Sequence, residues 1–162
     1  MKGRVRVAID ARRPLRHAVE VRYGSFLDPS FIALLRAHRI ALVIAENAGQ
    51  WPMPQDVTAD FIYIRLHGDK ELYRSGYSDR ALTRWARRIA ARHAGGEPAD
   101  GRRIAAPMRP ARKPRDVYCY FDNTDVKLRA PVDAGCLLRK LEGAPGTRPR
   151  SRGRAAHRQV TG

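Results

Sequence analysis

The stretch from Phe61 to Gly68 constrains the fold of this chain more than any other part of its sequence. It is a run of β-branched, aromatic and apolar residues of strand length, and a glycine ends it. Because strand side chains alternate with period two, one face is wholly apolar: Ile62, Ile64 and Leu66. The other face carries polar groups: Tyr63, Arg65 and His67. A buried charge must be paired, so this face points either to water at a sheet edge or into a shared polar cavity.

Three further segments have strand character, and three have helical character. The strands are predicted at 18–23, 40–45 and 116–121. The first helix is predicted over about 29–38, with Asp28 as N-cap, Pro29 at the first position and an apolar stripe of Phe31, Leu34 and Leu35. Ser78 caps the second, whose stripe is Leu82, Trp85, Ala86 and Ile89. The third spans about 131–142, starts at Pro131 and carries Leu137, Leu138 and Leu141.

This alternation of strands and helices predicts an α/β fold with a parallel sheet. Polar residues gather where each strand ends, and in parallel sheets ligands bind at the carboxyl ends of the strands. Four strands fit either a small open sheet or half of an eight-stranded barrel, which needs roughly 250 residues.

The net charge of +16 suggests nucleic-acid binding until it is mapped along the chain. Thirteen of the sixteen charges lie in segments 1–14, 94–115 and 143–162, whereas 15–93 and 116–142 together are only mildly basic. We therefore divide the chain into an irregular N-terminal segment (1–14), a first folded part (15–93), a flexible Gly/Pro/Arg-rich insertion (94–115), the last strand and helix (116–142) and a disordered basic tail (143–162).

Location follows from what the sequence lacks. No apolar run reaches the roughly 18 residues of a membrane span, and the N-terminus has no signal-peptide stretch. Cys119 and Cys136 match no zinc or redox spacing, which predicts two reduced thiols in a cytoplasmic protein.

Four ordered motifs resemble the YecE-like proteins, catalogued as domain of unknown function 72. They are His17–Phe26, Thr58–Gly68, Tyr77–Ala86 and Val117–Asn123. The resemblance runs from about residue 15 to 142, interrupted at 94–115, and covers the family's C-terminal half. It implies a partial TIM-like (β/α) barrel of about four βα units, with no assigned reaction. Where Glu46 stands the family tends to carry Asp, and where Asp122 and Asn123 stand it tends to carry two Asn.

The candidate site combines polar residues from the ends of the predicted strands. Glu20, Glu46 and His67 are the candidate catalytic groups, because a histidine beside a carboxylate exchanges protons near neutral pH. The candidate ligand-binding residues are Arg22, Arg65, Asn123, Asp122, Tyr73 and Tyr77. Two arginines favour an anionic ligand group, since the guanidinium fork holds phosphate or carboxylate at two points.

Several alternatives remain open at this stage. The charged pairs Glu20–Arg22 and Glu46–Arg65 could instead hold strands in register inside a barrel, and Glu46 with His67 could form part of a metal site. If active, the chain acts on a small polar sugar- or phosphate-like ligand, with an unknown cofactor requirement. Otherwise it is a nucleic-acid binder acting through Arg-rich segments, with weak and non-specific binding at most, or an inactive remnant. Open sheet edges predict self-association or a separately encoded N-terminal half.

Overall fold

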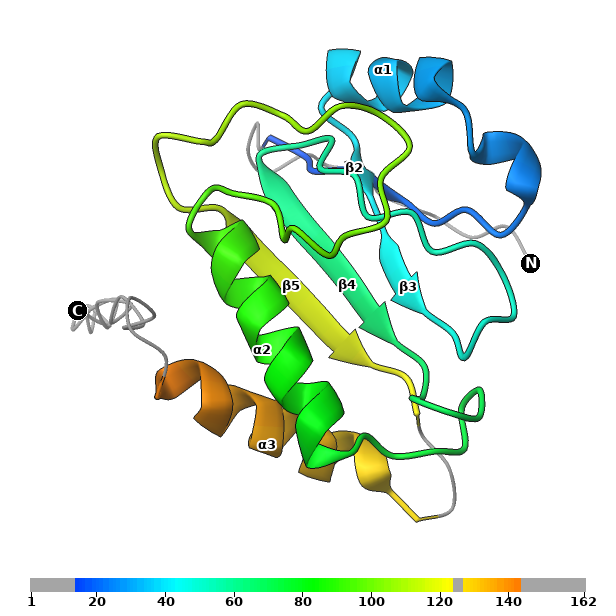
Figure 1. Ribbon diagram of the computed structural model, residues 1–162, viewed down its shortest axis with the longest axis vertical. Helices are drawn as coiled ribbons and strands as arrows, with labels where there is room; N and C mark the ends of the chain where they lie inside the picture. The colour runs from blue at the N-terminus through cyan, green and yellow to red at the C-terminus, as the bar shows by residue number, and fades with distance from the viewer. Residues whose placement is uncertain (1–13, 124–126, 144–162) are drawn as a thin grey trace, which may run out of the picture.

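The described part of the chain, residues 14–123 and 127–143 of a computed structural model, is an α/β structure in which every strand pairing is parallel (Figure 1). The strands are β1 (Ala18–Val19), β2 (Ala41–Leu42), β3 (Ile44–Glu46), β4 (Phe61–Leu66) and β5 (Asp116–Phe121). The helices are α1 (Pro29–Ala37), α2 (Asp79–His93) and α3 (Arg129–Glu142), with a 3-10 turn, η1, at Gly24–Phe26. The predicted α/β class and parallel order are confirmed.

Two parallel sheets share the segment 41–46. β1 pairs with β2, and β3, β4 and β5 form the second sheet in sequence order. Val43 interrupts the strand between β2 and β3, yet its N–H still donates to Val19 O at 2.9 Å. The ladder continues beyond the strand ends, because His67 N–H donates to Glu46 O at 2.9 Å and Asp122 N–H to Leu66 O at 2.8 Å. These bonds fix the position of the residues that follow β4 and β5.

The helices cover one face of the strands, as the alternation in β4 predicts. Ile62, Ile64 and Leu66 are all buried in a core with the apolar stripe of α2 and with Leu137 of α3. All four predicted stripe residues of α2 are buried. The stripes of the other helices need correction: Leu34 and Leu138 are 54% and 57% exposed, and Ile32 is the buried residue in α1 beside Leu35. The other predicted stripe residues hold, because Leu35 and Leu137 are buried and Phe31 and Leu141 pack partly buried against the core clusters.

Two predicted N-caps are present. The Asp28 carboxylate accepts a hydrogen bond from Ser30 N at 2.7 Å, with Pro29 at the start of α1. The Ser78 hydroxyl accepts one from Ala81 N at 3.2 Å at the start of α2. The third helix begins at Arg129, two residues before the predicted start, so Pro131 lies inside its first turn, where no intrahelical N–H is needed.

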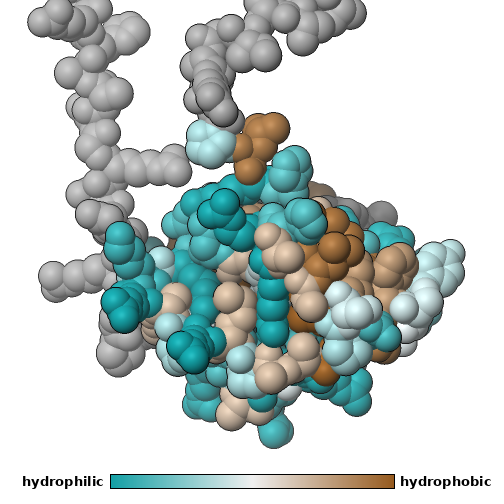
Figure 2. All heavy atoms as spheres, turned by 90° about the horizontal axis from the view of Figure 1, so that it is seen from above, coloured by the Kyte–Doolittle hydropathy of each residue, from teal (hydrophilic) through white to brown (hydrophobic). Residues whose placement is uncertain are grey.

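Segment 94–115 has no helix or strand, but it makes specific contacts across the amino ends of the strands (Figure 1). Asp56 accepts hydrogen bonds from the N–H groups of Ile104 and Ala105, both at 2.9 Å. Arg36 of α1 donates to Ala106 O, and Ile104 and Ala105 pack against the apolar cluster under α1. The composition of the segment predicted none of these contacts. Seen from this end, the surface is mostly hydrophilic with a smaller hydrophobic group (Figure 2).

Two predicted segments fall almost entirely outside the described residues. Of the irregular N-terminal segment (1–14) only Pro14 is described, and of the basic tail (143–162) only Gly143. None of the helices in the described part combines the length and apolar character that crossing a bilayer requires.

Candidate functional site

The face of the sheet that the helices leave uncovered bears an open pocket of about 630 Å³, which we call the inner pocket. Its residues come from all the strand segments and alternate with the core residues, as period two requires. It is lined by Arg16, Ala18, Glu20, Val43, Phe61, Tyr63, Arg65, Tyr118, Tyr120 and Asp122. Aromatic rings form its floor, with Tyr63 stacked on Tyr120 at a centroid distance of 5.1 Å. Its charged groups at the carboxyl end of the strands are Glu20, Arg65 and Asp122.

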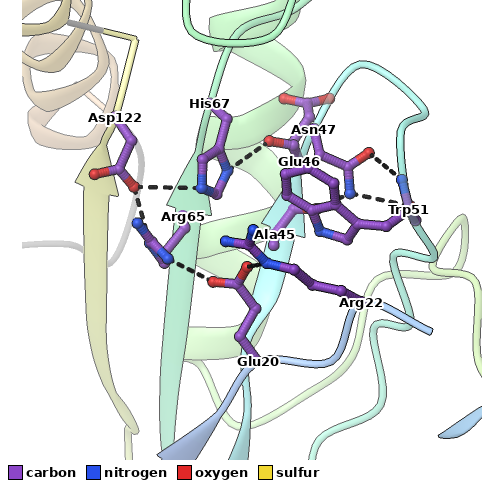
Figure 3. Close-up of polar contacts among 9 residues, drawn as sticks. All are labelled: Glu20, Arg22, Ala45, Glu46, Asn47, Trp51, Arg65, His67 and Asp122. Atoms are coloured by element: carbon purple, nitrogen blue, oxygen red, sulfur yellow. Dashed lines mark hydrogen bonds and ion pairs between the residues drawn. The ribbon is translucent and has the colours of Figure 1, made fainter.

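Arg65 joins two carboxylates from the two outer strands at this end. Its Nη1 donates to Glu20 Oε2 at 2.6 Å, and its Nε donates to Asp122 Oδ2 at 2.9 Å (Figure 3). Partial burial opposes the charge, but the bonds to Asp122 and Glu20 outweigh it and raise the pKa of the Arg65 guanidinium above its usual value. Glu20 also accepts a bond from Arg22 Nε at 3.1 Å. Two acids and two arginines thus form a charge-balanced group, which we call the Arg65 cluster.

His67 lies next to this cluster, but its side chain is fully buried. Its Nδ1 is 3.0 Å from Glu46 O, and because a carbonyl oxygen only accepts, Nδ1 carries a proton. Its Nε2 has no hydrogen-bond partner within the described part of the chain and lies 3.7 Å from Asp122 Oδ2. The rings of Trp51 and Tyr73 meet the imidazole edge-on at 5.6 and 5.3 Å. His67 does not line the inner pocket, and Asp122 is the pocket residue that its Nε2 approaches.

Trp51 also belongs to this region, although its only signal in the sequence is an aromatic residue in a Pro-rich loop. The Arg22 guanidinium lies over its ring at 4.6 Å, within the range of a cation–π contact. Asn47 holds the loop by donating from Nδ2 to Trp51 O and to Ala45 O, both at 3.0 Å (Figure 3). Trp51 Nε1 is buried without a hydrogen-bond partner among the described residues.

Glu46 is not in the inner pocket, which corrects the expectation that all candidate residues converge. Glu46 pairs with Leu66 in the ladder and therefore faces α2, where its carboxylate accepts a hydrogen bond from Trp85 Nε1 at 2.6 Å. Burial raises the pKa of Glu46, and the Trp85 bond only partly opposes this. The predicted pairing of Glu46 with Arg65 is therefore wrong.

Asn123 and Tyr77 also face the helices. The Asn123 amide donates to Asp133 Oδ2 at 2.8 Å and to Ser75 O at 3.2 Å, and its side chain is fully buried. The Tyr77 hydroxyl accepts from Gly68 N at 3.0 Å, and burial raises the pKa of that hydroxyl. These contacts fix the loops after β4 and β5. Of the remaining candidates, Glu20, Arg22, Arg65, His67, Tyr73 and Asp122 lie together.

The structure separates the two side chains, Glu46 and His67, that were considered for a metal site. Within residues 14–123 and 127–143 no group of three His, Cys, Asp or Glu side chains is placed to hold one. The Glu46 carboxylate bonds Trp85, and only the main-chain oxygen of Glu46 reaches His67. The two side chains named for a metal site therefore do not share one.

The tyrosine floor is the part of the site that sequence reasoning left out. Tyr118 and Tyr120 lie on the same face of β5 as Asp122 and are 40% and 48% exposed. The signal was present, because the alternation applied to β4 applies equally to β5.

Comparisons with known proteins agree with this fold. The family model "Protein of unknown function DUF72" matches residues 4–156. A crystal structure of a DUF72 family protein from Thermotoga maritima MSB8 is similar with a TM-score of 0.62 at 23% identity, over 80% of this chain and 47% of that one. A second crystal structure, of a DUF72 family protein from Enterococcus faecalis V583, is similar with a TM-score of 0.58 at 16% identity, over 84% of this chain and 51% of that one.

The chain thus spans about half the length of the solved proteins that it resembles. No curated protein matches it. At these identities the structural likeness shows the fold alone, whereas the family model covers nearly the whole sequence. The chain belongs to the DUF72 family of proteins of unknown function.

Proposed function

We propose that the inner pocket binds a small, neutral, sugar-like ligand at the carboxyl end of the strands. The observation that carries this proposal is the charge balance of the Arg65 cluster. The Arg65 guanidinium already bonds two carboxylates, and Arg22 bonds Glu20, so a phosphate would have to displace existing ion pairs. Hydroxyl groups instead donate to carboxylate oxygens while those ion pairs stay in place.

The tyrosine floor supports the same class of ligand. Aromatic rings offer an apolar surface to the C–H face of a sugar ring, and polar groups at one end fix its orientation. Asp122 is the group best placed for acid–base chemistry, because it faces the pocket and lies beside His67 Nε2. In this proposal His67 positions Asp122, and Glu20 and Asp122 accept hydrogen bonds from the ligand.

A ligand panel tests the proposal, with binding followed by the intrinsic fluorescence of the two tryptophans, Trp51 and Trp85. The panel holds neutral monosaccharides, their phosphates and inorganic phosphate, and we expect a saturable signal from a neutral sugar. Glu20→Gln should weaken that binding at least about tenfold, the loss of one hydrogen bond to a charged group. The control Asp100→Asn removes a carboxylate that pairs with Arg88 outside the pocket and should change nothing. Preference for phosphate would overturn the ligand class, and no binding by a folded protein would favour the inactive remnant.

We also propose that these parallel strands are part of a TIM-like barrel whose remaining strands come from outside this sequence or from a second copy. Support comes from the sequence-ordered parallel strands, the aromatic residues on the uncovered face and the half-length match to DUF72 structures. Exposed strand edges favour pairing with further strands. Sedimentation of the 162-residue chain should reveal self-association. A monomer that unfolds cooperatively and binds no hydrophobic dye would contradict this.

A further inference from the structure

The outward face of α2 is a ridge of arginines on the opposite side of the sheet from the inner pocket. Arg80, Arg84, Arg87 and Arg88 recur at helical spacing and line a groove of about 700 Å³ between α2 and the segment around Pro98. The apolar residues of α2 point the other way, into the core. The helix is therefore amphipathic, with these four arginines on its outward face, whereas Arg92 near its C-terminus is buried.

Few acids neutralise this ridge. Asp100 pairs with Arg88 through two nitrogens, at 2.7 and 3.1 Å, and Arg88 is the least exposed of the four arginines. Asp69 approaches Arg84 only to 3.9 Å. Within the described residues, Arg80 and Arg87 have no ion pair at all. Their guanidinium forks are free to bind an external anion at two points each.

The basic surface continues onto α3, which packs beside α2 (Figure 1). A second hollow of about 510 Å³ shares Thr83 and Arg87 with the first groove. It adds Arg139 and Lys140 from the last turn of α3. Lys140 is held by Asp79 at 2.6 Å, and among the described residues Arg139 donates to the Cys136 sulfur. The two connected hollows, which we call the basic belt, thus contain six cationic side chains and a single acid, Asp100.

The composition of the basic belt identifies the partner. Beside the charged residues, its lining within residues 14–123 and 127–143 consists of Thr83, Ala86, Ala90, Ala91, Pro98 and Gly143. There is no aromatic or large aliphatic side chain to stack on a base or to insert into a bilayer. An elongated row of guanidinium groups without a reading element is suited to a chain of phosphates.

We propose that the basic belt binds the phosphate backbone of nucleic acid without reading its sequence. The proposal places this binding on the folded surface of α2 and α3, not on the Arg-rich insertion or tail. It is independent of the ligand proposed for the inner pocket, because the two surfaces lie on opposite faces of the sheet and share no residue.

The test is fluorescence anisotropy with labelled single-stranded oligonucleotides, using the full chain at several salt concentrations. The variant Arg80→Gln, Arg84→Gln, Arg87→Gln removes three exposed charges and leaves Arg88, which packs over Trp85, intact. We expect the Kd of this variant for the oligonucleotides at low salt to be at least tenfold higher than that of the native chain. The slope of log K against log salt should fall by about 2, since each phosphate contact on a single strand contributes about 0.7. Oligonucleotides of different sequence should bind within about threefold of one another, as backbone contacts predict.

Two controls separate the belt from general positive charge. The variant Arg39→Gln, Arg109→Gln, Arg112→Gln removes the same charge from exposed positions outside the belt and should bind like the native chain. Replacing the five tail arginines by Gln should leave the effect of the belt variant in place. Equal weakening by belt and control variants, binding lost with the tail arginines alone, marked sequence selectivity, or no binding by the native chain would each overturn the proposal. Near-ultraviolet circular dichroism verifies that the variants fold.

Discussion

Asp56 provides a direct measure of how far segment 94–115 belongs to the fold. The Asp56 side chain is buried, and its two carboxylate oxygens accept from Ile104 N and Ala105 N at 2.9 Å each. A hydrogen bond to a charged group contributes about 1.5–3 kcal/mol, so Asp56→Ala removes two such bonds. Because the two N–H groups are only partly buried and can regain water, we expect a loss of about 3–4 kcal/mol in the free energy of unfolding. That is a large fraction of the roughly 5–15 kcal/mol typical of a domain.

Urea unfolding of the native chain, Asp56→Ala and Asp56→Asn tests this estimate. The Asp56→Asn variant keeps one acceptor oxygen, so its free energy of unfolding should lie between those of the native chain and Asp56→Ala. Limited proteolysis should cut between residues 94 and 115 faster in Asp56→Ala, because the carboxylate holds that segment to the domain. As a control, Asp100→Asn changes an exposed carboxylate in the same segment and should alter stability by less than about 0.5 kcal/mol. A loss below 1 kcal/mol with unchanged cleavage would refute the reasoning, and the segment would be dispensable.

Three further predictions concern residues that support the site. Gly68→Ala should destabilise the chain by about 2–4 kcal/mol, since φ is +129° and the new Cβ would clash with Glu71 O. Gly24→Ala, where a new Cβ has nothing within 4 Å, is its control in urea unfolding. Burial raises the pKa of the Glu46 carboxyl group, so the folded state binds that proton more tightly than the unfolded state does. The free energy of unfolding therefore falls as the pH rises from the unfolded-state pKa of Glu46 through its folded-state pKa. Glu46→Gln, which can still accept from Trp85, should match the native unfolding midpoint at acid pH and exceed it at neutral pH; a lower midpoint at neutral pH would contradict this. Asn123→Ala should cost about 2–3 kcal/mol by leaving Asp133 and Ser75 O short of a donor, without changing ligand binding in the inner pocket.

Local patterns predicted the fold well where one element decides its own geometry. The N-caps Asp28 and Ser78, the core stripe of α2 and the limits of β5 follow from the residues themselves, and the structure has them as predicted. Predictions were poorer where the structure of a segment depends on contacts with residues remote in sequence. The contacts of segment 94–115 depend on Asp56, which is remote in sequence and is brought to Ile104 and Ala105 only by the tertiary fold. Low-complexity composition carries no information about such a partner.

The candidate site shows the same division between local and tertiary information. Alternation along β4 and β5 puts Arg65 and Asp122 on one face, and since adjacent residues of an extended chain point oppositely, it also puts Asn123 on the other. The sequence therefore contained the reason to separate Asp122 from Asn123. Glu46 is different, because its strand is apolar on both faces and its own residues do not reveal which side meets the helices. Only the register with β4, which pairs Glu46 with Leu66, turns its carboxylate toward Trp85. A polar residue at the end of a doubly apolar strand thus stays ambiguous until the pairing of that strand is known.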